Sequence, residues 1–183
     1  MQIRPTPLEG CFIIQPKIFE DERGCFYESF NKQQFENLTG QRINFVQDNE
    51  SLSSKGVLRG LHFQKGKFAQ AKIVRVVKGS VQDVVVDIRP RSKTYGQYFS
   101  IELSEENRTQ LFIPRGFAHG YAVLSKTAEF FYKCDNFYNK EAEGGLIYND
   151  EHLAIDWKLD QKDISLSEKD RVQPAFGDHK PAL

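Results

Sequence analysis

A histidine and an arginine lie close together in an otherwise apolar run, Val57-Leu-Arg-Gly-Leu-His-Phe-Gln64. The imidazole of His62 can take up and release a proton near neutral pH, and the guanidinium of Arg59 can bind a phosphate or carboxylate through two hydrogen bonds. Polar groups on a buried strand need a partner or a ligand, because burying them alone costs free energy. The run therefore indicates a site with a partner or a ligand for these side chains, or else a core histidine bonded to backbone, which is the commoner arrangement for an isolated histidine.

Two further polar side chains share strand faces with apolar ones. Alternation in the predicted strand 69–77 places Lys72 on one face with two valines, and alternation in 127–138 places Tyr132 on one face with a phenylalanine and a cysteine. His62 shares its face with a glycine and a glutamine. A barrel whose inner face becomes polar at one mouth would collect these side chains. Each also has a structural interpretation, because a lysine can extend its amine from the mouth into water and a core tyrosine can keep its hydroxyl at the rim.

A second cluster, Phe112-Ile-Pro-Arg-Gly-Phe-Ala-His119-Gly, contains the P-x-G-x-x-H spacing and resembles the second motif of cupin barrels. Metal-binding cupins carry an H-x-H pair in their first motif, whereas the corresponding run here is His62-Phe63-Gln64. Three nitrogen and oxygen ligands are then hard to assemble, so we expect no metal at this site and disfavour a metal-dependent oxygenase. Without a metal, such a barrel must work through its side chains or only bind a ligand.

Apolar runs of strand length recur between turn signals along the middle of the chain, and this spacing predicts an all-β sandwich or barrel. The runs are 43–47, 57–63, 69–77, 81–88, 95–103, 109–114, 117–124 and 127–138. The segments on either side of Gly79 predict a hairpin. We expect one domain, because no linker, repeat or low-complexity tract interrupts the 183 residues.

The regions before and after these runs predict smaller elements. Two apolar stretches around the Asp-Glu-Arg-Gly turn at 21–24 predict a hairpin within 10–30. Residues 31–37, followed by a glycine stop, predict a short helix. Near the end, Ser165 followed by Glu168 fits a capping box and predicts one helical turn.

Composition excludes several functional classes. The 25 basic and 25 acidic side chains cancel, which argues against a nucleic-acid-coating or membrane-attracted surface. No long apolar run or signal-like segment is present, so we expect a cytoplasmic protein. The three cysteines are widely spaced and form no C-x-x-C pair, so we expect reduced thiols.

Taken together, these motifs resemble those of the dTDP-4-dehydrorhamnose 3,5-epimerases, and the resemblance runs almost end to end. The shared residues are Asp21-x-Arg23-Gly24-x-Phe26-x-Glu28, Gln47-Asp48-Asn49, Arg59-Gly60-Leu61-His62, Lys72, Asp83 to Arg89, Pro114-x-Gly116-x-x-His119, Tyr132-Lys133, Tyr138 and Leu166-Ser-x-Lys169-Asp170. The resemblance implies a cupin-like jelly-roll barrel, or double-stranded β-helix, with short peripheral helices. It also implies a barrel over about 43–138, a C-terminal segment 145–183 packed on it, and a homodimer that exchanges N-terminal strands within about 10–30.

The implied reaction converts dTDP-4-dehydro-6-deoxy-D-glucose into dTDP-4-dehydro-L-rhamnose in deoxysugar biosynthesis. Both C3 and C5 flank the C4 ketone, so loss of either proton gives an enolate, and reprotonation on the opposite face inverts the carbon. This needs a base, an opposing acid and a donor at the oxyanion, but no metal or nicotinamide cofactor. By resemblance, His62 is the base with Asp170 as its carboxylate partner, Tyr132 is the acid, and Lys72 stabilises the enolate.

The resemblance also implies a binding site for the nucleotide. Arg23 and Arg59 are the implied diphosphate clamps and Tyr138 the thymine-stacking residue. Further implied contacts to the substrate come from Glu28, Gln47, Asp48, Asn49, Lys72, His119, Glu143 and Lys169. Without the resemblance, Asp170 would be read as a solvated helix residue, Arg23 as a turn arginine and Glu28 as a surface strand position.

Three alternatives stay open at this point. An enzyme of the same family that inverts only C3, or a related keto-sugar isomerase, would share these motifs. A non-catalytic cupin that binds sugar nucleotides would need Arg59 and Tyr138 but no base and acid. The presence of His62, Lys72, Tyr132 and Asp170 disfavours the non-catalytic protein.

Overall fold

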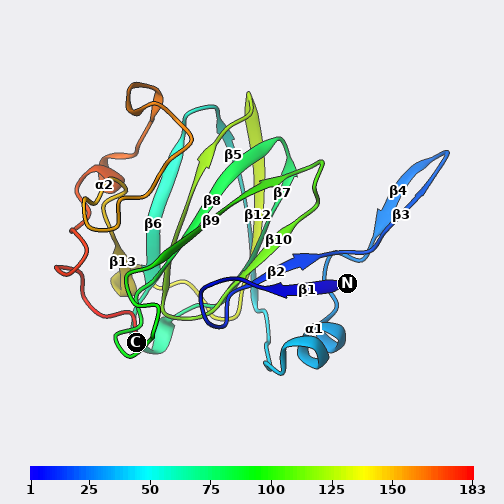
Figure 1. The fold of residues 1–183 in the computed structure, drawn as a ribbon, viewed down its shortest axis with the longest axis horizontal. Coiled ribbons are helices and arrows are strands. Elements are labelled where there is room, and N and C mark those ends of the chain that lie inside the picture. Colours follow the sequence, from blue (N-terminus) through cyan, green and yellow to red (C-terminus); the bar gives the residue numbers. More distant parts are fainter.

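Two antiparallel sheets face one another in the computed structural model, which describes residues 1–183 (Figure 1). The larger sheet has the order β1 (Gln2–Pro5), β2 (Phe12–Gln15), β10 (Gln110–Ile113), β7 (Lys72–Lys78), β12 (Thr127–Cys134), β5 (Gln47–Ser54). The smaller has the order β13 (Glu143–Gly145), β6 (Leu58–Gln64), β11 (Phe117–Val123), β8 (Ser80–Asp87), β9 (Tyr98–Ser104). The predicted all-β jelly-roll class is confirmed.

Apolar side chains fill the space between the sheets and also cover the outer faces of both. The central cluster contains Val74 and Phe130, as alternation along their strands predicts. A second cluster lies where the C-terminal segment packs on β6, β8 and β11, and a third lies under the helix α1 (Lys32–Thr39). Every residue of β11 is buried, which explains why its sequence is a continuous run and not an alternating one.

The strands on either side of Gly79 do not form the predicted hairpin. β7 pairs with β10 and β12 in one sheet, whereas β8 pairs with β9 and β11 in the other. Only Gly79 separates the two strands, and the favoured hairpin loops have two residues. Gly79 has φ of 78° and turns the chain from one sheet into the other, so this prediction is wrong.

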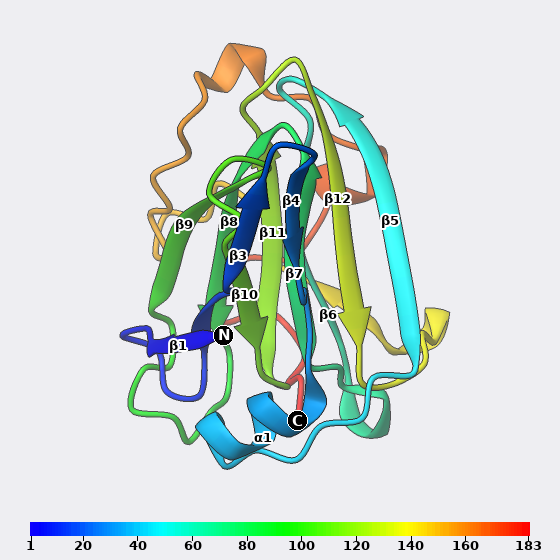
Figure 2. The ribbon, with the colours of Figure 1, turned by 90° about the vertical axis from the view of Figure 1, so that its right-hand side faces the viewer.

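The structure also changes the predicted strand over 43–47. The observed strand β5 starts at Gln47 and continues through the polar stretch to Ser54. β5 is an edge strand whose one neighbour is β12, and Figure 2 shows the two strands side by side. Its inward side chains border a cavity instead of the apolar core, so the run lacks the apolar residues by which strands are recognised.

The N-terminal region forms a separate hairpin. β3 (Ile18–Asp21) pairs with β4 (Gly24–Tyr27) across the predicted turn, but β2 joins β1 and β10 in the large sheet. This hairpin projects away from the barrel (Figure 1). The predicted helix that follows it is confirmed as α1, with Asn31 as its N-cap and Gly40 as its C-cap.

The C-terminal segment packs against the small sheet and carries the helix α2 (Glu168–Arg171). Ser167 caps this helix by accepting a hydrogen bond from the Asp170 amide, so the predicted cap at Ser165 is wrong. Ser165 instead forms a parallel bridge with Val57. Short 3₁₀ turns lie at Gly66–Phe68, Lys140–Ala142 and Gln161–Asp163. No helix has the length and apolar character needed to cross a membrane.

Candidate active site

An irregularity in β6 brings Arg59 and His62 to the same cavity. Strict alternation would place these two side chains on opposite faces of the strand. The pairing with β11 matches His62 to His119 but Arg59 to Tyr121, so β6 carries one residue more than its partner between the two pairs. Gly60 occupies this bulge with φ of 135°, and a Cβ there would lie 2.5 Å from a backbone atom of β11. Only glycine fits this position.

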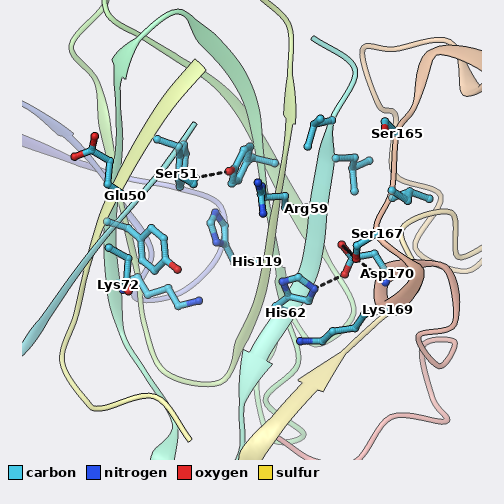
Figure 3. Close-up of a pocket in the computed structure, with 17 residues that line it drawn as sticks. Glu50, Ser51, Arg59, His62, Lys72, His119, Ser165, Ser167, Lys169 and Asp170 are labelled. Atoms are coloured by element: carbon cyan, nitrogen blue, oxygen red, sulfur yellow. Dashed lines mark hydrogen bonds and ion pairs between the residues drawn. The ribbon is translucent and has the colours of Figure 1, made fainter. Parts of the chain in front are cut away.

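A cavity of about 610 Å³ lies between the two sheets, and Figure 3 shows the side chains that point into it. They come from β5, β6, β7, β11 and β12 and from the C-terminal segment. The predicted residues among them are Asn49, Arg59, His62, Lys72, His119, Tyr132, Lys169 and Asp170. A smaller adjoining hollow shares four of these residues and adds Gln47, Tyr138 and Glu143.

His62 and Asp170 form a hydrogen-bonded pair on one wall of the cavity. The His62 Nε2 donates to Asp170 Oδ1 at 2.5 Å, and the Ser167 hydroxyl donates to the other carboxylate oxygen at 2.9 Å. Burial alone would raise the pKa of Asp170, but the hydrogen bonds from His62 and Ser167 and the charge of Lys169 hold that pKa below its ordinary value. The carboxylate therefore stays ionised and fixes the orientation of the imidazole.

Lys72 and Tyr132 lie on the opposite wall, on neighbouring strands of the large sheet. The Lys72 Nζ is 5.6 Å from the centroid of the Tyr132 ring. The Lys72 amine points into the cavity (Figure 3). Burial lowers the pKa of Lys72 and raises the pKa of Tyr132 to about 12. Tyr132 is thus protonated at neutral pH, so it can serve as a proton donor and not as a base.

A second histidine–carboxylate pair meets the cavity through His119, which lines it, whereas its partner Asp83 is fully buried. The His119 Nε2 donates to Asp83 Oδ2 at 2.8 Å, and both side chains are buried. The other oxygen of Asp83 has no hydrogen-bond partner. Asp83 was not among the predicted site residues, although a carboxylate in the middle of a valine-rich buried strand was a signal for it.

The rim of the cavity carries two cations with different surroundings. The Lys169 Nζ donates to Glu143 Oε2 at 2.5 Å, so its charge is neutralised by the protein. Arg59 has no carboxylate partner, and its Nε donates to the Ser53 hydroxyl at 3.1 Å. An unpaired guanidinium facing a cavity fits an anionic ligand.

Three predicted binding residues lie away from the cavity. Arg23 is at the tip of the β3–β4 hairpin, 83% exposed and bonded to Asp21. Glu28 is exposed and accepts a hydrogen bond from a glutamine of α1. Asp48 points to the outer face of β5 and pairs with Lys133. Within a single chain, the structure does not bring these three side chains to the site.

Several lining residues were not predicted from the sequence. They are Glu50, Ser51, Val57, Leu58, Tyr121, Phe130, Ser165, Leu166 and Ser167. Gln64, which stands where a metal-binding cupin has its second histidine, accepts a hydrogen bond from the Asn139 amide and holds that loop. The structure contains no group of three or more His, Cys, Asp or Glu side chains arranged to hold a metal ion.

The fold and the cavity define a cupin-like jelly-roll protein whose site is built from acid–base side chains and an unpaired arginine. Sequence comparison gives the particular family: the model for dTDP-4-dehydrorhamnose 3,5-epimerase matches residues 5–178, and the chain belongs to this family. The epimerase of that name from Salmonella typhimurium is 51% identical over 95% of this chain and 94% of its own.

Solved structures agree with this assignment. A dTDP-4-dehydrorhamnose 3,5-epimerase from Elizabethkingia anophelis superimposes with a TM-score of 0.95 at 59% identity, covering 97% of each chain. The dTDP-6-deoxy-D-glucose-3,5-epimerase from Legionella pneumophila, solved in complex with dTDP-4-keto-L-rhamnose, superimposes with a TM-score of 0.92 at 49% identity, covering 96% of this chain and 93% of its own.

Proposed function

We propose that this protein inverts C3 and C5 of dTDP-4-dehydro-6-deoxy-D-glucose to give dTDP-4-dehydro-L-rhamnose, a step in deoxysugar biosynthesis. The observation that carries the proposal is the position of His62 on the small sheet, hydrogen-bonded to Asp170 of α2, opposite Lys72 and Tyr132 on the large sheet. Membership of the epimerase family and the sugar nucleotide bound to the Legionella relative support the same substrate.

The geometry supports a division of labour in the proton transfers. His62 removes the proton from C3 or C5, and ionised Asp170 stabilises the imidazolium that forms. The Lys72 ammonium stabilises the negative charge that develops on the C4 oxygen. Tyr132 then delivers its proton from the opposite wall, which inverts the carbon. A single base and acid on opposite faces act on each carbon in turn, after His62 has released its proton to solvent and Tyr132 has taken one up.

The nucleotide extends from the sugar towards the rim of the cavity. Arg59 binds the diphosphate, because its guanidinium lacks a carboxylate partner in the protein. Tyr138 is half-exposed at the adjoining hollow and offers an aromatic face to the base. Gln47, Asn49, His119, Glu143 and Lys169 supply polar contacts along this path.

We also propose a homodimer in which the β3–β4 hairpin completes the site of the partner subunit. The hairpin projects from the barrel (Figure 1), and its Phe19 and Phe26 are 54% and 71% exposed, which is unfavourable unless another surface covers them. Arg23 at its tip would then supply a second cation to the diphosphate, while Glu28, at the base of the hairpin, would supply a carboxylate to the same partner site. A cytoplasmic location stays a prediction from the sequence.

Mixing two inactive variants tests the exchange of hairpins. Arg23→Ala removes the arginine but keeps the base, whereas His62→Ala removes the base but keeps the arginine. Equal amounts of the two variants are unfolded together and refolded, so that about half of the dimers contain one subunit of each kind. If the hairpin acts in the partner's site, each of these mixed dimers has one intact site out of two. About one quarter of all sites should then be active. No regain of activity, or a monomer by sedimentation, would contradict the dimer proposal.

Deuterium exchange tests the reaction itself. Incubating the protein with dTDP-4-dehydro-6-deoxy-D-glucose in deuterated water should introduce label at both C3 and C5, as read by NMR. His62→Ala should abolish exchange at both carbons while dTDP binding persists. Label at C3 alone would identify a C3-only epimerase, and dTDP binding without any exchange would identify a non-catalytic sugar-nucleotide-binding protein.

A further inference from the structure

The hydroxyl of Ser53 is the polar group of the protein that contacts the Arg59 guanidinium. Ser53 lies on the inward face of β5 and is 6% exposed. The Arg59 Nε donates to Ser53 Oγ at 3.1 Å, and this is the one hydrogen bond that the Arg59 side chain makes within the chain. No ion pair competes for the guanidinium, so this serine alone sets its hydrogen-bonded orientation.

The geometry of a guanidinium makes this contact directional. Its three nitrogens lie in one plane, and the Nε–H points to the side while the two terminal nitrogens form a fork at the end. When Ser53 holds the Nε–H, the plane can no longer rotate freely. The N–H groups of the terminal nitrogens then remain available for two parallel hydrogen bonds to a phosphate.

Backbone pairing of β5 with β12 holds Ser53 in place. Its strand pairs in register with β12, where Ser53 stands opposite Ala128. After the turn at Gly56, the Leu58 amide donates to the Ser165 carbonyl at 3.0 Å, which ties the start of β6 to the segment leading into α2. The Ser53–Arg59 bond therefore joins β5 of the large sheet to β6 of the small sheet, and each of these strands is also held by its own backbone hydrogen bonds.

We propose that Ser53 is a positioning residue for phosphate recognition, which holds Arg59 so that its terminal nitrogens face the diphosphate. The inference rests on the proposed function, in which Arg59 binds that group. Ser53 itself contacts no substrate. It contributes to the affinity for phosphorylated ligands and leaves the proton transfers at the sugar unaffected.

Calorimetric binding of dTDP and of thymidine tests this role. Ser53→Ala should weaken dTDP binding roughly tenfold, because it removes a hydrogen bond to a charged group and frees the guanidinium to rotate. Thymidine affinity should not change. In Ser53→Ala, the KM for the sugar nucleotide should rise while kcat stays nearly constant. Ser53→Thr keeps the hydroxyl and should have the KM of the parent. Ser54→Ala, an outward-facing serine on the same strand, is the matched control.

A double-mutant cycle separates this inference from the proposed function. In an Arg59→Ala background, Ser53→Ala should cause no further loss of dTDP affinity, since the group it positions is gone. If Arg59→Ala weakens dTDP binding but Ser53→Ala does not, or if Ser53→Ala weakens thymidine equally, the role of Ser53 is overturned. If Arg59→Ala itself leaves dTDP affinity unchanged, the phosphate assignment of Arg59 is what fails.

Discussion

Replacing Asp170 by asparagine removes the negative charge beside His62 with little change in the shape of the side chain. Asp170 is 3% exposed and its Oδ1 lies 2.5 Å from His62 Nε2. With charge centres about 4 Å apart and an effective dielectric constant near 20, the carboxylate stabilises an imidazolium by about 4 kcal/mol. The His62 side chain is 36% exposed, so solvent screening reduces this to about 2–4 kcal/mol.

That loss falls on the transition state, where His62 becomes positively charged. At about 1.4 kcal/mol for each factor of ten, Asp170→Asn should lower kcat by about 30- to 1000-fold. The KM should change little, because Asp170 contacts the base and not the nucleotide. The rate of deuterium incorporation at C3 and C5, followed by NMR at saturating substrate, measures the effect directly.

Asp163→Asn provides the matched control, since Asp163 is an exposed aspartate in the same C-terminal segment. It should retain the parent kcat. Thermal unfolding of Asp170→Asn should first establish that the variant is folded. A folded Asp170→Asn protein with the turnover number of the parent would refute the reasoning, because the imidazolium would then gain nothing from its carboxylate partner.

Three other predictions concern the acid, the bulge and the pH dependence of stability. Tyr132→Phe should slow product formation by about 10²–10⁴-fold while exchange by His62 persists, as NMR can distinguish. Gly60→Ala should lower the Tm by several degrees and by more than Gly177→Ala, since both glycines have positive φ but only Gly60 is crowded by backbone. The pKa of Asp170 is lower in the folded protein than its ordinary value, so the ionised carboxylate stabilises the fold above about pH 4. This contribution is lost as the pH falls through the folded pKa. Acid should therefore reduce the Tm of the parent more than the Tm of Asp170→Asn, as thermal unfolding at several pH values measures.

The sequence predicts those parts of the site that follow from regular strands. Alternation alone turned Lys72 and the ring of Tyr132 towards the interior, and both line the cavity. The same rule fails for Arg59 and His62, because the bulge at Gly60 depends on pairing with β11, which is distant in sequence. Local pattern contains no information about which strand will lie alongside another.

Other features were missed for related reasons. β5 is a strand because β12 pairs with it, not because its residues favour one, and its polar inward face reflects the cavity that it borders. Ser53 and Asp83 act through partners on other strands, so neither stands out in a linear motif. Arg23 lies away from the cavity of its own chain, since its hairpin points away from the barrel, so its proposed contact with the diphosphate depends on a partner subunit.

The two histidine–carboxylate pairs of the cavity differ in a way that decides their roles. His62 exposes 36% of its side chain, whereas His119 exposes 8% and stacks on Phe130 at 6.0 Å between ring centroids. A base must approach the carbon it deprotonates to within about 3.5 Å, which requires an accessible ring nitrogen. The carboxylate of Asp170 is fully hydrogen-bonded, while one oxygen of Asp83 has no partner. This difference supports the proposed assignment of His62 as the base and of His119 as a substrate contact on the cavity wall.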